Sequence, residues 1–236
     1  MVIGHIHSSG GIALPEFSQG TNMKTDFWLQ RWERGEISFH EGEVNHFLVE
    51  HFTKLSLAKG SRVFLPLCGK TRDCAWLLAH GYRIAGAELS EIAISELFEE
   101  LGLQPQIAKA GELVHYSADD IDILVGDIFN VSAAYLGPVS AIYDRAALVA
   151  LPASMRAQYA SHLMNITDSA PQLLITYEYN QLMMDGPPFS VGKEEVRQHY
   201  GANYQLQCLA SRNIPGGMKG KVPSTEAAWL LQKAAK

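Results

Sequence analysis

The stretch VFLPLCGKT, residues 63–71, decides the fold because it joins a short apolar strand to the start of a helix. The apolar residues within 62–65 predict a buried strand, and Pro66 with the glycine behind it predicts a turn. The chain then resumes a helical spacing of apolar residues over 71–80. A buried strand followed at once by a helix is the first half of a βαβ unit.

The same pattern repeats in the next segment, GYRIAGAELS, residues 81–90. A second strand is predicted for residues 82–89, and Ser90 can cap a helix that Gly102 ends. Strand, helix, strand, helix at this spacing indicates right-handed crossovers and a parallel sheet. Five further strands are predicted, the last two as a hairpin with a long connection, at residues 121–126, 139–143, 172–179, 204–210 and 227–232. The sequence therefore predicts an α/β fold with a seven-stranded, mostly parallel sheet.

Two amphipathic helices are predicted before this sheet, at residues 25–34 and 43–58. In the first, Trp28 and Trp32 are four residues apart and therefore share one helix face. A later helix is predicted after Pro152, a residue that suits the first helical turn. We expect helices on both faces of the sheet and an N-terminal helical cap.

The composition limits the classes of function that the chain can have. Its 236 residues include 19 Lys and Arg against 25 Asp and Glu, so the formal net charge is −6. This charge and the lack of a basic run argue against nucleic-acid binding. No apolar stretch reaches the roughly 20 residues that a membrane span needs. Cys68, Cys74 and Cys208 are an odd, widely spaced set, which is typical of reduced thiols in the cytoplasm.

Residues 1–22 differ from the rest of the chain. They are rich in Gly and Ser, contain no Lys or Arg, and are followed by a second methionine, Met23. They lack the basic start of a secretory signal. We interpret them as a leader or tag, mostly disordered, and residues 23–236 as a single domain. Two histidines, His5 and His7, make a weak metal site by themselves, and we predict no metal ion.

The Gly-Lys-Thr that ends the opening stretch resembles a phosphate-binding loop but lacks the other residues of that motif. The motif needs a glycine five residues before Gly69, where this chain has Phe64. Pro66 also removes one N–H donor of the phosphate cradle. The dinucleotide fingerprint is absent as well. The turn therefore argues against a nucleotide hydrolase and for a ligand that has no phosphate to be cradled.

Acidic residues follow the next two predicted strands. In open α/β sheets, ligands bind beyond the carboxyl ends of the strands. Glu88 ends the second strand, where a carboxylate can accept hydrogen bonds from two ribose hydroxyls. Asp127 follows the third strand and could accept from an adenine amino group while Ile128 packs on the ring; it could equally cap a turn. A glycine turn with these acids is the layout of an S-adenosylmethionine site.

Several motifs occur in the chain in a fixed order: FWLQRWERGEISFHEG, LPLCGKT, GAELS, GDIF, YDRAALVALP and GPPF. Together they resemble bacterial thiopurine S-methyltransferases, from Met23 to nearly the end of the chain. The resemblance implies a class I methyltransferase fold, Rossmann-like, that uses S-adenosylmethionine and yields S-adenosylhomocysteine. It also implies methyl transfer to the sulfur of small aromatic or heterocyclic thiols such as thiopurines, by a cytoplasmic monomer.

The resemblance also assigns residues to the site. The cofactor contacts that it implies are Trp28, Trp32, Leu67, Glu88, Asp127, Ile128 and Arg145. Phe39 is implied as an aromatic residue on the acceptor side. Arg145 is implied to lie close to both the cofactor and the acceptor, and hence to act as the catalytic residue. A second basic residue is expected in the loop before the last strand, where the candidates are Arg212, Lys219 and Lys221.

The expected chemistry is an in-line displacement at the methyl carbon. A heteroaromatic thiol is more acidic than a protein thiol of pKa about 8.5, so its anion forms without a strong base. A nearby Arg145 would favour this anion, which predicts a cationic, aromatic-walled acceptor pocket. Residues 186–189, GPPF, are expected to form a stiff loop over its mouth. Cys68 is interpreted as a wall residue, because no His or Asn pattern supports a cysteine nucleophile.

Other functions share part of this pattern. A related methyltransferase could act on halide or thiocyanate, or on selenium and tellurium oxyanions. A non-catalytic module that binds an adenosyl ligand would keep Glu88 and Asp127 but need not keep Arg145, Phe39 and the GPPF loop. Their joint presence favours an enzyme.

Overall fold

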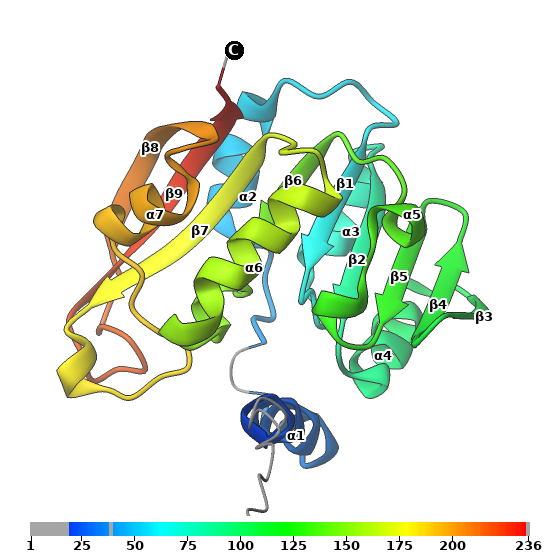
Figure 1. Cartoon of the computed structure of the whole chain (residues 1–236), viewed down its shortest axis with the longest axis horizontal. Coiled ribbons are helices and arrows are strands. Elements are labelled where there is room, and N and C mark those ends of the chain that lie inside the picture. The colour runs from blue at the N-terminus through cyan, green and yellow to red at the C-terminus, as the bar shows by residue number, and fades with distance from the viewer. Residues whose placement is uncertain (1–18, 38–39, 235–236) are drawn as a thin grey trace, which may run out of the picture.

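A mixed β-sheet forms the centre of the molecule (Figure 1). The computed structural model describes residues 19–37 and 40–234. Within these residues nine strands pair in the order β3-β4-β5-β2-β1-β6-β7-β9-β8. Their bounds are β1 Arg62–Pro66, β2 Arg83–Glu88, β3 Gln106–Ala110, β4 Leu113–Ala118, β5 Ile121–Val125, β6 Ala141–Asp144, β7 Gln172–Tyr179, β8 Tyr204–Asn213 and β9 Ser224–Lys233.

The central strands β5, β2, β1, β6 and β7 run parallel to one another. After its first residue, every side chain of β1 is buried. Burial on both faces explains the continuous apolar run in this strand, because helices cover both sides of a parallel sheet. The strand order reverses between β1 and β6. Open α/β sheets bind their ligands beyond the strand ends at such a reversal.

The sheet has nine strands where the sequence predicted seven. The additional strands, β3 and β4, form a hairpin that continues the sheet antiparallel beside β5. The first four residues of β3 are exposed, so this strand lacks the apolar alternation that reveals a strand in a sequence. Gly111 forms the turn at a φ of +65°, a conformation that glycine adopts readily. At the other end of the sheet, β8 and β9 form the predicted hairpin.

Helices cover the two faces of the sheet and create two cores. Figure 1 shows α6 in front of the sheet and α2 and α3 behind it. On one face Phe64 of β1 belongs to the same core as Tyr159 of α6. On the other face its neighbour Val63 belongs to the same core as Leu77 of α3. The helices after the N-terminal one are α2 His46–His51, α3 Asp73–Ala79, α4 Glu91–Leu101, α5 Ala133–Leu136, α6 Ala153–Ile166 and α7 Lys193–Tyr200.

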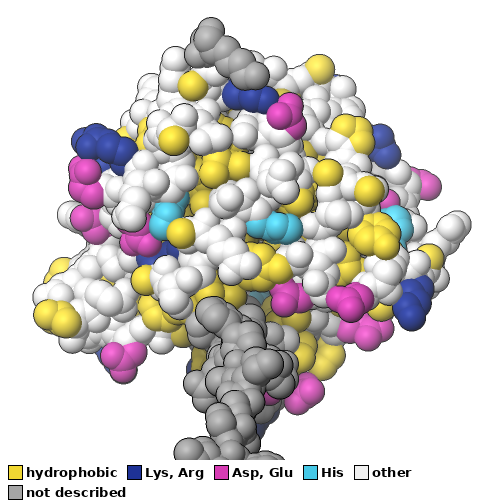
Figure 2. Space-filling view, in the orientation of Figure 1, with side chains coloured by type: hydrophobic (Ala, Val, Ile, Leu, Met, Phe, Trp, Pro, Cys, Tyr) yellow, Lys and Arg dark blue, Asp and Glu magenta, His cyan; other side chains and the backbone are white. Residues whose placement is uncertain are grey.

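The N-terminal helix, α1, spans Gln19–Glu33. It begins earlier than the predicted residue 25, so the last four residues of the segment interpreted as a leader lie within it. No helix among residues 19–37 and 40–234 is long and apolar enough to cross a membrane. On the face drawn in Figure 2, Lys and Arg side chains are few and scattered.

The helix predicted for residues 43–58 is shorter in the structure. The side chain of Asn45 caps α2, so the helix begins only at His46. A 3₁₀ turn, η1 Phe52–Leu55, follows, and Ser56 then adopts a left-handed φ of 53°. Capping and turn chemistry therefore divide what the apolar stripe alone predicted as one helix.

Candidate active site

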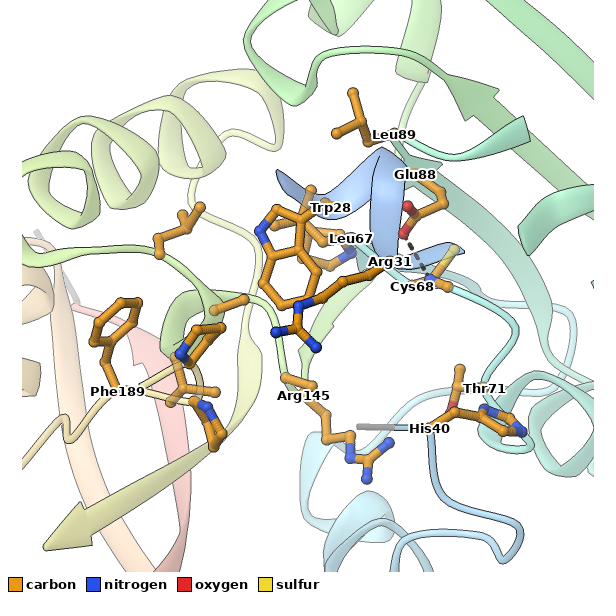
Figure 3. Close-up of a pocket in the computed structure, with 18 of the residues that line it drawn as sticks. Trp28, Arg31, His40, Leu67, Cys68, Thr71, Glu88, Leu89, Arg145 and Phe189 are labelled. Carbon is orange, nitrogen blue, oxygen red and sulfur yellow. Dashed lines mark hydrogen bonds between the residues drawn. The ribbon is translucent and has the colours of Figure 1, made fainter. Parts of the chain in front are cut away.

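A cavity of 980 Å³ opens at the carboxyl ends of the parallel strands. Its walls come from the turn after β1, the end of β2, the segments after β5 and β6, and helix α1. The GPPF segment and the loop before β9 complete it. Figure 3 shows side chains from these separate segments around one space. The structure thus brings together most of the residues that the sequence assigned to a site.

The turn after β1 brings the main chain close to α1. Leu67 has a φ of 47° and Gly69 a φ of 52°, both in the left-handed region. Such a conformation is strained for leucine and marks a position that the surrounding structure enforces. A Cβ atom on Gly69 would lie 3.2 Å from Cζ2 of Trp32. A side chain at this position would therefore force the indole ring to shift away from the turn.

Glu88 lies at the end of β2 and its carboxylate holds the turn in place. Gly69 N–H donates to its Oε2 (2.8 Å), and Ser90 N–H donates to its Oε1 (2.9 Å). The residue is 6% exposed. Burial raises the pKa of the Glu88 carboxyl, and the backbone donors partly offset this effect. Each oxygen keeps a second lone pair, so hydroxyl groups of a ligand can still donate to it.

Asp127 and Ile128 follow β5 and line the same cavity. Asp127 Oδ1 accepts the N–H of Phe129 (2.9 Å) and so caps the short 3₁₀ turn η2, Ile128–Asn130. Asp127 is therefore both a turn cap and a wall residue, whereas the sequence left these two roles as alternatives. His162 of α6 supports the turn from behind, since its Nε2 lies 2.8 Å from the carbonyl oxygen of Ile128.

Helix α1 places Trp28 and Trp32 on the cavity wall. Trp32 is 6% exposed. Figure 3 shows Trp28 and Arg31 projecting from α1 into the cavity. Sequence reasoning missed Arg31, whose guanidinium carbon lies 4.6 Å from the ring centre of Phe27. Its position three residues after Trp28 on the same helix face was the available signal.

Arg145 lies just after β6, and its side chain is 8% exposed. It forms an ion pair with Glu41, and its Nε has no hydrogen-bond partner among the residues that the structure describes. Burial disfavours its charge, but Tyr177, Glu41, Tyr143 and Asp73 together raise the pKa of Arg145 above its ordinary value. Arg145 is therefore a permanent cation.

Carboxylates that the sequence analysis did not assign surround this cation. Glu41, Asp73 and Glu226 all line the cavity. Asp73 is fully buried and accepts Asn45 N–H (2.8 Å) and the Tyr143 hydroxyl (3.0 Å). The part of the cavity around Arg145 therefore holds several acids and is not simply cationic, as was predicted. Glu41 belongs to the quoted FHEG motif, so its neighbourhood was visible in the sequence while its pairing was not.

The structure separates the three basic candidates, of which Arg212 lies in β8 and Lys219 and Lys221 lie in the loop before β9. Arg212 forms two hydrogen bonds with Glu50, at 2.8 and 2.7 Å, and is absent from the cavity wall. Lys221 is likewise not on that wall, whereas Lys219 is. Lys219 Nζ donates to the carbonyl oxygen of Pro187 (2.8 Å). Burial, with Arg31 and Lys221, lowers the pKa of the Lys219 ammonium.

The GPPF segment, residues 186–189, forms part of the cavity wall as expected. Phe189 N–H donates to the carbonyl oxygen of Val149 (2.7 Å), and the Tyr179 hydroxyl donates to that of Pro188 (2.7 Å). A Cβ on Gly186 would lie 2.6 Å from the Phe189 ring. These contacts hold the aromatic ring against the turn. Phe39 lies outside the described residues, whereas His40 beside it lines the cavity.

Neither Lys70 nor the cysteines form reactive groups in this site. Lys70 pairs with Glu96 (2.8 Å) and Glu100 (3.0 Å) of α4. Burial raises the pKa of the Cys68 thiol, which therefore stays protonated in the wall. Cys74 is also buried, whereas Cys208 is exposed on β8. The described part of the chain contains no group of His, Cys, Asp and Glu that could hold a metal ion.

Solved structures with this architecture define the class of protein. A SAM-dependent methyltransferase from Anabaena variabilis superposes with a TM-score of 0.58 at 15% identity, over 88% of this chain and 95% of that one. The 1,6-didemethyltoxoflavin-N1-methyltransferase of Burkholderia thailandensis, solved with S-adenosylhomocysteine, gives a TM-score of 0.60 at 13% identity, over 96% and 94%. The chain has the fold of the SAM-dependent methyltransferases, which confirms the predicted fold class.

Sequence relatives define the family within that class. The thiopurine S-methyltransferase profile matches residues 23–229. A thiopurine S-methyltransferase of Xanthobacter autotrophicus is 54% identical over 90% of this chain and 100% of its own length. One from Teredinibacter turnerae is 50% identical over 89% and 98%. The chain belongs to the thiopurine S-methyltransferase family.

Proposed function

We propose that this protein transfers the methyl group of S-adenosylmethionine to the sulfur of small aromatic or heterocyclic thiols such as thiopurines. The observation that carries the proposal is a single cavity with a buried carboxylate, Glu88, at one strand end and a buried cation, Arg145, at another. The first suits a nucleoside, and the second suits an anionic sulfur. Membership of the family supports the same reaction.

The residues on the nucleoside side fit S-adenosylmethionine. Glu88 would accept the two ribose hydroxyls, because its carboxylate is already oriented by two backbone donors. Asp127 would accept from the adenine amino group, and Ile128 would pack on the ring. The bend at Leu67 would set the main chain against the methionine part of the cofactor. Trp32 and Trp28 would exclude water from the methionine end of the cofactor. The close packing of Trp32 on the turn at Gly69 supports this role.

The acceptor side provides orientation and charge. The bound cofactor supplies a methyl group on a sulfonium sulfur, and transfer forms a bond from the acceptor sulfur to carbon as the old sulfur–carbon bond breaks. Holding the thiolate in line with that bond can lower the barrier by roughly 7–11 kcal/mol. Arg145 would favour the thiolate over the thiol and orient it. Phe39, Phe189 and Lys219 would complete the acceptor pocket.

The test starts with calorimetric titration by S-adenosylhomocysteine, which we expect to bind one molecule per chain. Turnover is then measured on a panel of a thiopurine, thiocyanate, iodide and selenite, and we expect the thiopurine to be methylated fastest. A lack of S-adenosylhomocysteine binding would overturn the proposal. Binding without turnover on any acceptor would indicate a non-catalytic module instead. A preference for thiocyanate, iodide or selenite would reassign the substrate class.

The proposal includes a small-molecule thiol substrate, no nucleic-acid or membrane partner, a monomeric state and a cytoplasmic location. The net charge of −6 supports the absence of a nucleic-acid partner. Gel filtration with light scattering tests the oligomeric state, and a mass of twice 26.0 kDa would contradict a monomer.

A further inference from the structure

Arg145 is already engaged by a carboxylate in this structure. Its Nη2 forms an ion pair with Glu41, which lies in the segment before α2. The arginine side chain is 8% exposed, whereas the glutamate side chain is 48% exposed. The cation is therefore fixed in the wall, and the anion that pairs with it can leave by rotating its side chain toward solvent.

The other acids near Arg145 are held by different partners. Asp73 is fully buried and accepts from Asn45 N–H and the Tyr143 hydroxyl. Glu226 is 8% exposed and accepts from the side-chain amide of Asn45 (3.3 Å). These contacts do not need Arg145. Glu41 is consequently the exchangeable negative charge at the cavity face of the arginine.

Arg145 itself lines the cavity, so a ligand anion that replaced Glu41 would meet the same guanidinium. A guanidinium on a cavity wall can bind small anions of many kinds, because its planar fork matches carboxylates and phosphates. An unguarded Arg145 would thus be occupied by whichever small anion is most abundant.

We propose that Glu41 is a specificity-determining residue that competes with ligand anions for Arg145. An anion joined to an aromatic ring can replace Glu41, because its ring also gains contact with the apolar wall that includes Phe189 and Trp28. A small inorganic anion lacks that additional contact and is rejected. This inference rests on the proposed function, since it assumes that an anionic acceptor binds at Arg145.

The experiment compares wild type, Glu41→Gln and the control Glu43→Gln, an exposed acid of the same segment. The chain is saturated with S-adenosylhomocysteine, so that no methyl transfer occurs. Calorimetry then measures binding of 4-nitrobenzenethiolate, which is anionic at neutral pH, and of 4-nitrothioanisole, its neutral methylated counterpart. Thiocyanate is titrated separately as a small inorganic anion.

We expect Glu41→Gln to bind the thiolate about tenfold more tightly, since a competing charge is removed. Binding of the neutral thioether should stay within about twofold of wild type. Thiocyanate, titrated alone, should also bind Glu41→Gln more tightly than wild type. Glu43→Gln should behave as wild type throughout.

Two results would overturn the competition by Glu41. One is unchanged thiolate affinity in Glu41→Gln; the other is an equal gain for the thiolate and the thioether, which would indicate a change of shape instead of charge. Failure of the underlying function is recognised separately, because wild type would then bind no S-adenosylhomocysteine in the first titration.

Discussion

At the scale of single residues, Asp144 holds the turn that presents Arg145 to the cavity. It is fully buried, its Oδ1 accepts Leu148 N–H (3.1 Å), and its Oδ2 accepts the Tyr159 hydroxyl (2.9 Å). Ala146, between them, adopts a left-handed φ of 61°. The position of the arginine therefore depends on a neighbouring carboxyl group that does not touch the ligand space.

Asp144 should make the stability of the protein depend on pH. Burial raises its pKa from 3.8 to about 6 in the folded state, so the folded state holds a proton that the unfolded chain releases. This contribution to stability is present below pH 4 and is lost as the pH rises through about 6. Across that window it amounts to about 3 kcal/mol.

Urea unfolding of wild type and Asp144→Asn is measured at pH 4.0, near the ordinary pKa of 3.8, and at pH 7.0, above the raised pKa of about 6. The difference between the two proteins should change with pH in the stated direction. Asp168→Asn, which alters an acid whose side chain is 97% exposed, is the control and should follow wild type. A pH-independent difference would show that Asp144 is ionised equally in both states.

Arg145→Ala should lower kcat/KM for a thiopurine by about 100-fold or more, as the loss of one charge-stabilising donor does in other enzymes. Arg145→Lys keeps the positive charge but loses the planar set of donors, so its kcat/KM should lie between those of wild type and Arg145→Ala. Steady-state kinetics measures the activity, and near-ultraviolet circular dichroism checks the fold. An activity loss that only tracks the loss of folded protein would assign Arg145 a structural role.

At the scale of elements, α1 is joined to the sheet through contact of Trp32 with the turn after β1. The ring packs where Gly69 has no side chain, at 3.2 Å from the position of a Cβ. Helix and turn therefore form one wall of the cavity, although the residues come from different elements. A substitution of Gly69 should therefore shift both α1 and the turn after β1.

Gly69→Ala tests this contact. The left-handed φ of 52° should cost about 1 kcal/mol of stability in any case. The added methyl group should also displace Trp32, change the tryptophan emission and weaken S-adenosylhomocysteine binding. Gly102→Ala is the matched control, because Gly102 has a φ of +69° but nothing within 4 Å of a Cβ. It should lose similar stability while binding stays unchanged; equal binding losses in both variants would refute the packing role of Trp32.

These elements also show what the sequence could and could not predict. The strand ends at Glu88 and Arg145 were predictable, because buried apolar runs stop there and polar residues follow. The β3–β4 hairpin was not, because β3 is exposed and has no alternating pattern. The pairing of Glu41 with Arg145 joins segments far apart in the chain, and no local pattern encodes such a contact. Choosing Lys219 over its neighbours likewise required the path of the loop.

At the scale of the whole molecule, the cavity links segments from the N-terminal helix to the loop before β9. A ligand in this cavity would contact the ends of the strands that lie between the two hydrophobic cores, so its binding would stabilise both cores. S-Adenosylhomocysteine at one hundred times its Kd should thus stabilise the fold by about 2.7 kcal/mol. For a chain of this size, that corresponds to a rise in Tm of about 5–10 °C.

Differential scanning calorimetry with and without ligand measures that rise. Glu50→Gln removes a partner of the exposed Arg212 away from the cavity wall, so its Tm should increase by the same amount on ligand addition. A ligand that binds in calorimetry but leaves the Tm unchanged would mean that it binds the unfolded chain equally well.

The distribution of the thiols has a practical consequence for experiments on this molecule. Cys68 and Cys74 are buried and burial raises their pKa values, whereas Cys208 is exposed on β8. A maleimide dye should therefore attach to the native chain at one position, outside the cavity wall. Trp229 pairs with Cys208 across β8 and β9, so energy transfer from tryptophan to that dye would mainly report whether this hairpin stays paired in solution, without any engineered cysteine.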